Sequence, residues 1–108
     1  MPRATEGLER LLVSGRDDAV LRFSLGNAYL YEDPEKAVEH FERALEFDPG
    51  YSAAWKLLGK ALASKGEISR AREVFSKGIV VAESRGDVQA AKEMRVFMKR
   101  LEPTHPTD

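Results

Sequence analysis

The 108-residue chain contains no cysteine, which excludes a disulfide framework, a thiolate nucleophile and a cysteine-based metal site. It also lacks a long apolar run, because nothing approaches the roughly 20 residues of a membrane span. Residues 1–14 lack the apolar stretch and the cleavage site of a secretory signal. No segment shows the sustained alternation of a half-buried strand. We therefore expect an all-α protein of the cytoplasm, without a membrane segment.

Charge of one sign is not in excess either. The 17 basic and 18 acidic residues leave a net charge of −1, which argues against general nucleic-acid binding. The charges are unevenly spread: residues 1–54 carry eleven acids and six bases, and residues 55–108 carry seven acids and eleven bases. This asymmetry fits an oriented partner, head-to-tail contact between copies, or an ordinary solvated surface.

Motifs for catalysis and metal binding are missing as well. Glycine-rich phosphate loops are absent, and no serine has the G-x-S-x-G context of a nucleophile. The two histidines, His40 and His105, lack a metal-binding spacing such as H-E-x-x-H. Glu39 and Glu42 flank His40 as on a solvated helical face, so we predict a surface histidine. We expect no enzymatic activity, no cofactor and no metal.

Apolar periodicity and helix-stop residues predict six helices, at residues 5–14, 18–31, 34–47, 51–64, 68–84 and 87–101. Asp33 can cap the third helix, with Pro34 at its first position, where a missing N–H costs nothing. The sequence at 48–50, Asp-Pro-Gly, ends that helix. Gly86 ends the fifth helix and Asp87 caps the sixth.

An internal repeat is present. The stretch Leu-Gly-Asn-Ala-Tyr at 25–29 aligns with Leu-Gly-Lys-Ala-Leu at 58–62, 33 residues later. Three small or aromatic residues of the following helix, Ala37, Phe41 and Ala44, align with Ala71, Phe75 and Gly78, each 34 residues later.

Glycine inside a helix is costly, by about 1 kcal/mol relative to alanine. Gly26 and Gly59 are a matched pair of such residues, so we infer that they allow close approach of a neighbouring helix. Ala37 and Ala71 serve the same two crossings, and the aligned phenylalanines are expected to fill the space between hairpins.

These positions resemble the tetratricopeptide repeat pattern W-x₂-L-G-x₂-Y…A-x₃-F…P. The second repeat matches at Trp55, Leu58, Gly59, Ala71 and Phe75, and the first at Leu25, Gly26, Tyr29, Ala37, Phe41, Ala44 and Pro49. The departures are Arg22 in the first repeat, where the aromatic would stand, and Leu62, Gly78 and Glu83 in the second. The whole chain is also similar to compact bacterial tetratricopeptide proteins of about this length.

The resemblance implies one domain, 1–108, folded as a right-handed α-α superhelix of about six antiparallel helices. Its parts are an N-terminal helix at 5–14, repeats at 19–51 and 52–85, a capping helix at 87–101 and a disordered tail at 102–108. Two repeats bury too little alone, so the flanking helices must cover the ends. Their apolar stripes are Leu8, Leu11 and Leu12 in the first helix, and Val88, Ala91, Met94, Phe97, Met98 and Leu101 in the last.

In similar proteins, the first helix of each hairpin lines a concave groove that binds a peptide or a partner helix. The corresponding positions here are Val20, Phe23, Asn27, Leu30 and Tyr31 in the first repeat and Ala53, Lys56, Lys60, Ala63 and Ser64 in the second. With apolar side chains facing outward beside two lysines, we hypothesise a ligand segment with an apolar anchor and a carboxylate. Alternatively, the N-terminal helix folds over Phe23 and Tyr31.

The expected function is a protein-interaction adaptor. The alternatives are a homodimer or assembly subunit and, less favoured, an RNA-binding accessory protein that uses the basic residues of the last helix: Lys92, Arg95, Lys99 and Arg100. The carboxylate clamp of chaperone-tail-binding members is not expected, since only Asn27 fits its pattern.

Overall fold

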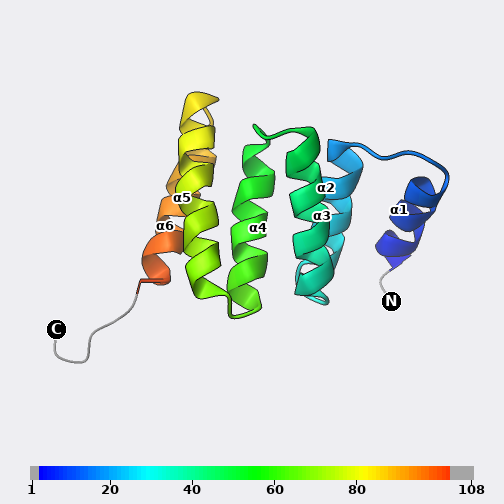
Figure 1. The fold of residues 1–108 in the computed structure, drawn as a ribbon, viewed down its shortest axis with the longest axis horizontal. Coiled ribbons are helices and arrows are strands. Elements are labelled where there is room, and N and C mark those ends of the chain that lie inside the picture. Colours follow the sequence, from blue (N-terminus) through cyan, green and yellow to red (C-terminus); the bar gives the residue numbers. More distant parts are fainter. Residues whose placement is uncertain (1–2, 103–108) are drawn as a thin grey trace.

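A computed structural model describes residues 3–102 of the chain. These residues form six α-helices and no strand: α1 (Arg3–Val13), α2 (Ala19–Tyr29), α3 (Pro34–Phe47), α4 (Ser52–Ser64), α5 (Ile68–Ser84) and α6 (Val88–Arg100). The helices follow one another along the long axis of the molecule, with α2/α3 and α4/α5 as hairpins and α6 beside α5 (Figure 1). The prediction of an all-helical repeat fold is confirmed. The predicted tail lies mostly outside the described residues.

Local capping chemistry sets the helix starts. The carboxylate of Asp33 accepts a hydrogen bond from the amide of Lys36 at 3.3 Å, and Pro34 opens α3. Asp87 accepts in the same way from Ala90 at 3.1 Å and caps α6. Each cap satisfies an amide that has no partner within its helix. The predicted starts of α3 and α6 are therefore confirmed to within one residue.

The two matched glycines mark close helix crossings. A Cβ placed on Gly26 would lie 2.5 Å from Cε1 of Phe41, and a Cβ on Gly59 would collide with the ring of Phe75. Ala37, which follows Gly26 in the repeat pattern, is fully buried, as is Ala71 in the second hairpin. The inference of close approach is confirmed. Each phenylalanine packs onto the glycine of its own hairpin, and Phe75 also reaches Phe97 of α6, so a role of both rings between the hairpins stays a prediction.

A third glycine explains one departure from the repeat pattern. At Gly78 of α5, a Cβ would lie 2.6 Å from the sulfur of Met94 and 2.8 Å from Cβ of Trp55. Met94 on α6 is fully buried. The alanine of the family pattern would have no room here, so glycine lets α6 and α4 pack onto the same part of α5.

The first and last helices, α1 and α6, bury fewer apolar side chains than the sequence predicts. In α1, Leu8 and Leu12 pack against the core, but Leu11 is 40% exposed. In α6, the core contacts come from residues 90 onward, and Val88, which starts the helix, is 66% exposed. The predictions that Leu11 and Val88 belong to the buried stripes are wrong.

Candidate functional site

The first helix of each hairpin and α6 present side chains along one side of the molecule. Nζ of Lys56 on α4 lies 2.9 Å from Oε1 of Glu93 on α6. Between the two hairpins, the ring of Phe23 on α2 stacks on Tyr51 at the start of α4, with centroids 4.8 Å apart. These contacts align α2, α4 and α6, and we call their shared surface the α2–α4–α6 face.

The predicted site residues differ in their exposure to solvent. Asn27, Ser64, Val20 and Tyr31 are exposed, the last two at 58% and 79%. Half-buried positions are Phe23, Ala53, Lys56, Lys60 and Ala63.

Leu30 is the exception, because only 3% of it is exposed. It follows Gly26 by four residues and so lies on the same side of the helix, toward the core rather than toward solvent. The prediction that Leu30 faces outward is therefore wrong.

The N-terminal helix does not cover Tyr31. Helix α1 docks elsewhere: the Tyr29 hydroxyl donates a hydrogen bond to Oε1 of Glu9 at 3.3 Å, and the same carboxylate oxygen lies 3.8 Å from Nε2 of His40. Phe23 is half-buried by the rings of Phe41 and Tyr51. The alternative in which α1 folds over this part of the face is wrong.

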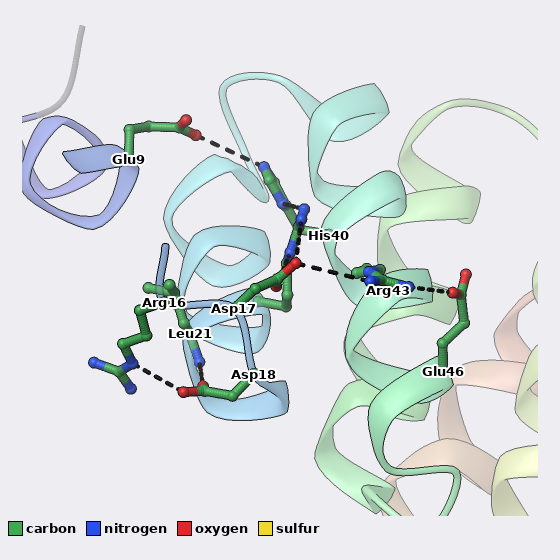
Figure 2. A network of polar contacts seen from close by, with 9 residues as sticks. Glu9, Arg16, Asp17, Asp18, Leu21, His40, Arg43 and Glu46 are labelled. Carbon is green, nitrogen blue, oxygen red and sulfur yellow. Dashed lines mark hydrogen bonds and ion pairs between the residues drawn. The ribbon is translucent and has the colours of Figure 1, made fainter. Parts of the chain in front are cut away.

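A polar cluster holds α1 and its linker against the first hairpin (Figure 2). Arg22 occupies the position where the repeat pattern has an aromatic residue. Its guanidinium donates two hydrogen bonds to Asp17, at 2.7 and 3.0 Å, and a third group, Nη1, lies 3.2 Å from Nδ1 of His40. His40 also stacks on Tyr29, with centroids 5.7 Å apart. Arg22 thus connects α2 to the linker through an ion pair with Asp17 and to α3 through a hydrogen bond to His40. These polar contacts replace the apolar packing of an aromatic side chain.

His40 is 8% exposed, so the prediction of a surface histidine is wrong. A guanidinium can only donate, so Nδ1 of His40 accepts and the imidazole is neutral, with its proton on Nε2. Burial, followed by the charges of Arg22 and Lys36, lowers the pKa of His40, while Glu9 and Glu39 act in the opposite direction. The hydrogen bond from Arg22 also lowers the pKa of the Asp17 carboxyl.

The stability of the protein is expected to fall as pH drops below about 6.5, the ordinary histidine pKa. The pKa of His40 is lower in the folded protein than in the unfolded chain. The neutral imidazole therefore contributes its full stabilisation above the unfolded-state pKa, and this stabilisation is lost as pH falls toward the folded-state pKa. One proton gives a slope of at most about 1.4 kcal/mol per pH unit. Urea unfolding between pH 8 and 5.5 measures it.

The control for this titration is His40→Asn, whose side-chain oxygen can replace Nδ1 as the acceptor for Arg22. His105 is unchanged in both proteins, so its titration cancels in the comparison. We expect the variant to lose the pH-dependent component between pH 7 and 5.5. An equal slope in both proteins would contradict the assignment.

At the far end of the α2–α4–α6 face, a pocket of about 450 Å³ lies between α4 and the end of α6. Its lining is Lys60, Ala63, Ser64, Phe75, Phe97, Arg100 and Leu101. The three residues from the end of α6 were not predicted as site residues. Helix α6 lacks the Leu-Gly pair that marks α2 and α4, so its register could not be read from the repeat.

Within residues 3–102, no cluster of three or more histidine, aspartate or glutamate side chains could hold a metal ion. None of the described helices is long and apolar enough to cross a bilayer.

Comparison with known proteins agrees with the repeat pattern and the fold. The model of the tetratricopeptide repeat family matches residues 28–94. A TPR repeat-containing protein of Pseudomonas aeruginosa is 50% identical over 98 residues, which cover 90% of this chain and 93% of that protein.

Solved structures give the same result. A Bordetella parapertussis protein determined in solution has a TM-score of 0.83 at 46% identity, covering 94% of this chain and 89% of that one. YrrB, described as a TPR protein with an unusual peptide-binding site, has a TM-score of 0.64, with 94% of this chain and 60% of that one covered. Its identity of 22% shows the fold alone. The chain belongs to the tetratricopeptide repeat family.

Proposed function

We propose that the protein is an interaction module that binds a segment of another protein along the α2–α4–α6 face. The observation that carries this proposal is the uncovered row formed by Val20, Asn27 and Tyr31 on and just after α2. Two large apolar side chains, Val20 and Tyr31, are exposed there at 58% and 79%. Exposed apolar and aromatic side chains on one face are typical of contact sites.

Polar groups next to this row suit a peptide backbone. The side-chain amide of Asn27 is exposed and can both donate and accept a hydrogen bond. Lys56, by contrast, is engaged by Glu93 at 2.9 Å. Binding a ligand carboxylate at Lys56 would require breaking that ion pair. Lys56 is therefore a poorer candidate than Lys60 for binding a ligand carboxylate.

The experiment is affinity capture with two matched variants. The face variant combines Val20→Asp and Tyr31→Asp, and the control variant combines Ser76→Asp and Val80→Asp on α5, where both residues are exposed. We expect partners captured by the unaltered protein to be lost with the face variant and kept with the control. Circular dichroism confirms the fold of both variants. Partners retained by the face variant would contradict the proposal.

A further inference from the structure

The pocket between α4 and α6 combines an apolar floor with two cations. Phe75 is fully buried at its base, and Phe97 is half-buried, with the two ring centroids 5.9 Å apart. Nζ of Lys60 lies 5.0 Å from the centroid of Phe97, and Cζ of Arg100 lies 5.9 Å from the same centroid. Both distances are within the range of cation–π attraction. The ring of Phe97 therefore helps to position the Lys60 ammonium and the Arg100 guanidinium at the pocket.

Lys60 and Arg100 differ from the neighbouring lysines in their pairing. Within residues 3–102, no ion pair includes Lys60 or Arg100, whereas Lys56 and Lys65, on the same helix or just beyond it, pair with Glu93 and Glu67 at 2.9 Å each. An anion bound at the pocket would give both cations a counter-charge.

We propose that this pocket binds a protein segment in which an apolar side chain stands next to a carboxylate. The apolar side chain lies on Ala63, Phe97 and Leu101, and the carboxylate pairs with the cations of the lining, Lys60 and Arg100. The hydroxyl of Ser64, exposed at the rim, adds a neutral donor. The proposal rests on the proposed function, since it assigns the end of the α2–α4–α6 face to one chemical class of ligand.

Charge complementarity favours this occupant over an apolar helix. An apolar partner would leave Lys60 desolvated without a counter-charge, at a free-energy cost that a carboxylate removes. A carboxylate alone would leave the apolar floor unused. The guanidinium of Arg100 can donate two parallel hydrogen bonds to one carboxylate, which a lysine cannot do.

The probe is the hexapeptide acetyl-Gly-Ser-Leu-Asp-Ser-Gly-amide, titrated into the isotopically labelled protein and followed by amide chemical shifts. Its matched control has asparagine in place of aspartate, which removes the charge and keeps the shape. We expect the acidic peptide to shift the amides of Ala63, Phe97 and Leu101. The neutral peptide should bind about fivefold more weakly or worse, the factor for one lost ion pair of about 1 kcal/mol.

A pair of protein variants completes the test. The double variant Lys60→Gln/Arg100→Gln should weaken the acidic peptide to the level of the neutral one. The variant Lys92→Gln/Lys99→Gln removes the same charge from exposed positions of α6 and should leave binding unchanged. If both variants bind alike, long-range attraction accounts for binding and the pocket assignment is wrong.

Two further results would overturn the inference. The first is no shift at the pocket with millimolar acidic peptide. The second is a lower melting temperature of the Lys60→Gln/Arg100→Gln variant with unchanged peptide affinity, which would mean that the cations only stabilise helix ends. The affinity capture through Val20 and Tyr31 does not depend on either result, so a failure of the pocket assignment can be told apart from a failure of the proposed function.

Discussion

Replacing Phe75 by alanine is expected to lower the free energy of unfolding by about 3–5 kcal/mol, the usual cost of removing a buried aromatic ring. Phe75 is fully buried, and its ring lies against Gly59 of α4 and near Phe97 of α6. One side chain therefore fills the space among three helices. Small domains have only about 5–15 kcal/mol of stability, so this variant should be close to unfolding at 37 °C.

Phe47 provides the matched control, because it is a phenylalanine at the end of α3 that is 44% exposed. Its ring contacts the guanidinium of Arg43, with Cζ 4.6 Å from the centroid. Phe47→Ala should cost no more than about 1 kcal/mol. Urea unfolding followed by circular dichroism measures both variants, and equal losses would refute the central packing role of Phe75.

The loss at Phe75 should also spread unequally along the chain. Stability in stacked repeats comes from each unit and its nearest neighbours. The second hairpin and α6 meet at Phe75, while the first hairpin is built around Phe41 and its own glycine. Amide exchange in Phe75→Ala should rise in α4, α5 and α6 before it rises in α2 and α3. Uniform acceleration would indicate a single cooperative unit.

Local signals made the helices and crossings predictable. A cap such as Asp33 followed by proline acts through amides within a few residues, so the start of α3 could be read without knowledge of the fold. The glycine pair was informative for a different reason. A costly residue repeated at the same place in two helices indicates a compensating contact, and the rings of Phe41 and Phe75 provide it.

The error at His40 has a different cause, because tertiary partners far apart in the sequence cannot be read from spacing. The acidic neighbours of His40 predict a solvated face, but Arg22, 18 residues earlier, and Glu9 on α1 enclose it. Arg22 departs visibly from the repeat pattern, but its partner Asp17 lies in a linker without periodicity, so the pairing is not predictable. The absence of the aromatic residue at position 22 is readable from the sequence, but the ion pair between Arg22 and Asp17 is seen only in the folded chain.

The candidate site was predicted in part for the same reason. Lys60 was placed by its repeat position, which defines the exposed side of α4. Phe97 and Arg100 belong to α6, whose sequence has no Leu-Gly register mark, and Phe97 was assigned wholly to the apolar stripe. The half-buried ring does both: it contacts Phe75 in the core and Lys60 at the surface.

Gly26→Ala is expected to destabilise the protein by up to about 2 kcal/mol, although alanine is the better helix former. A new Cβ would lie 2.5, 2.6 and 2.8 Å from three ring atoms of Phe41, a rigid and fully buried side chain. Overpacking costs about 1–3 kcal/mol, and three contacts under 3.0 Å with a buried ring favour the upper part of that range, above the gain in helix propensity of about 1 kcal/mol. Chemical unfolding of the single variant gives the sign directly.

Gly7→Ala isolates the propensity term, because Gly7 lies within α1 and a Cβ there would meet no atom within 4 Å. That variant should be more stable by up to about 1 kcal/mol. Combining Gly26→Ala with Phe41→Leu should cost less than the sum of the two single changes, since the smaller side chain leaves room for the new methyl group. If Gly26→Ala stabilises the protein as much as Gly7→Ala does, the first hairpin does not depend on the contact between α2 and the ring of Phe41. The repeat would then hold its glycine for a reason other than close helix packing.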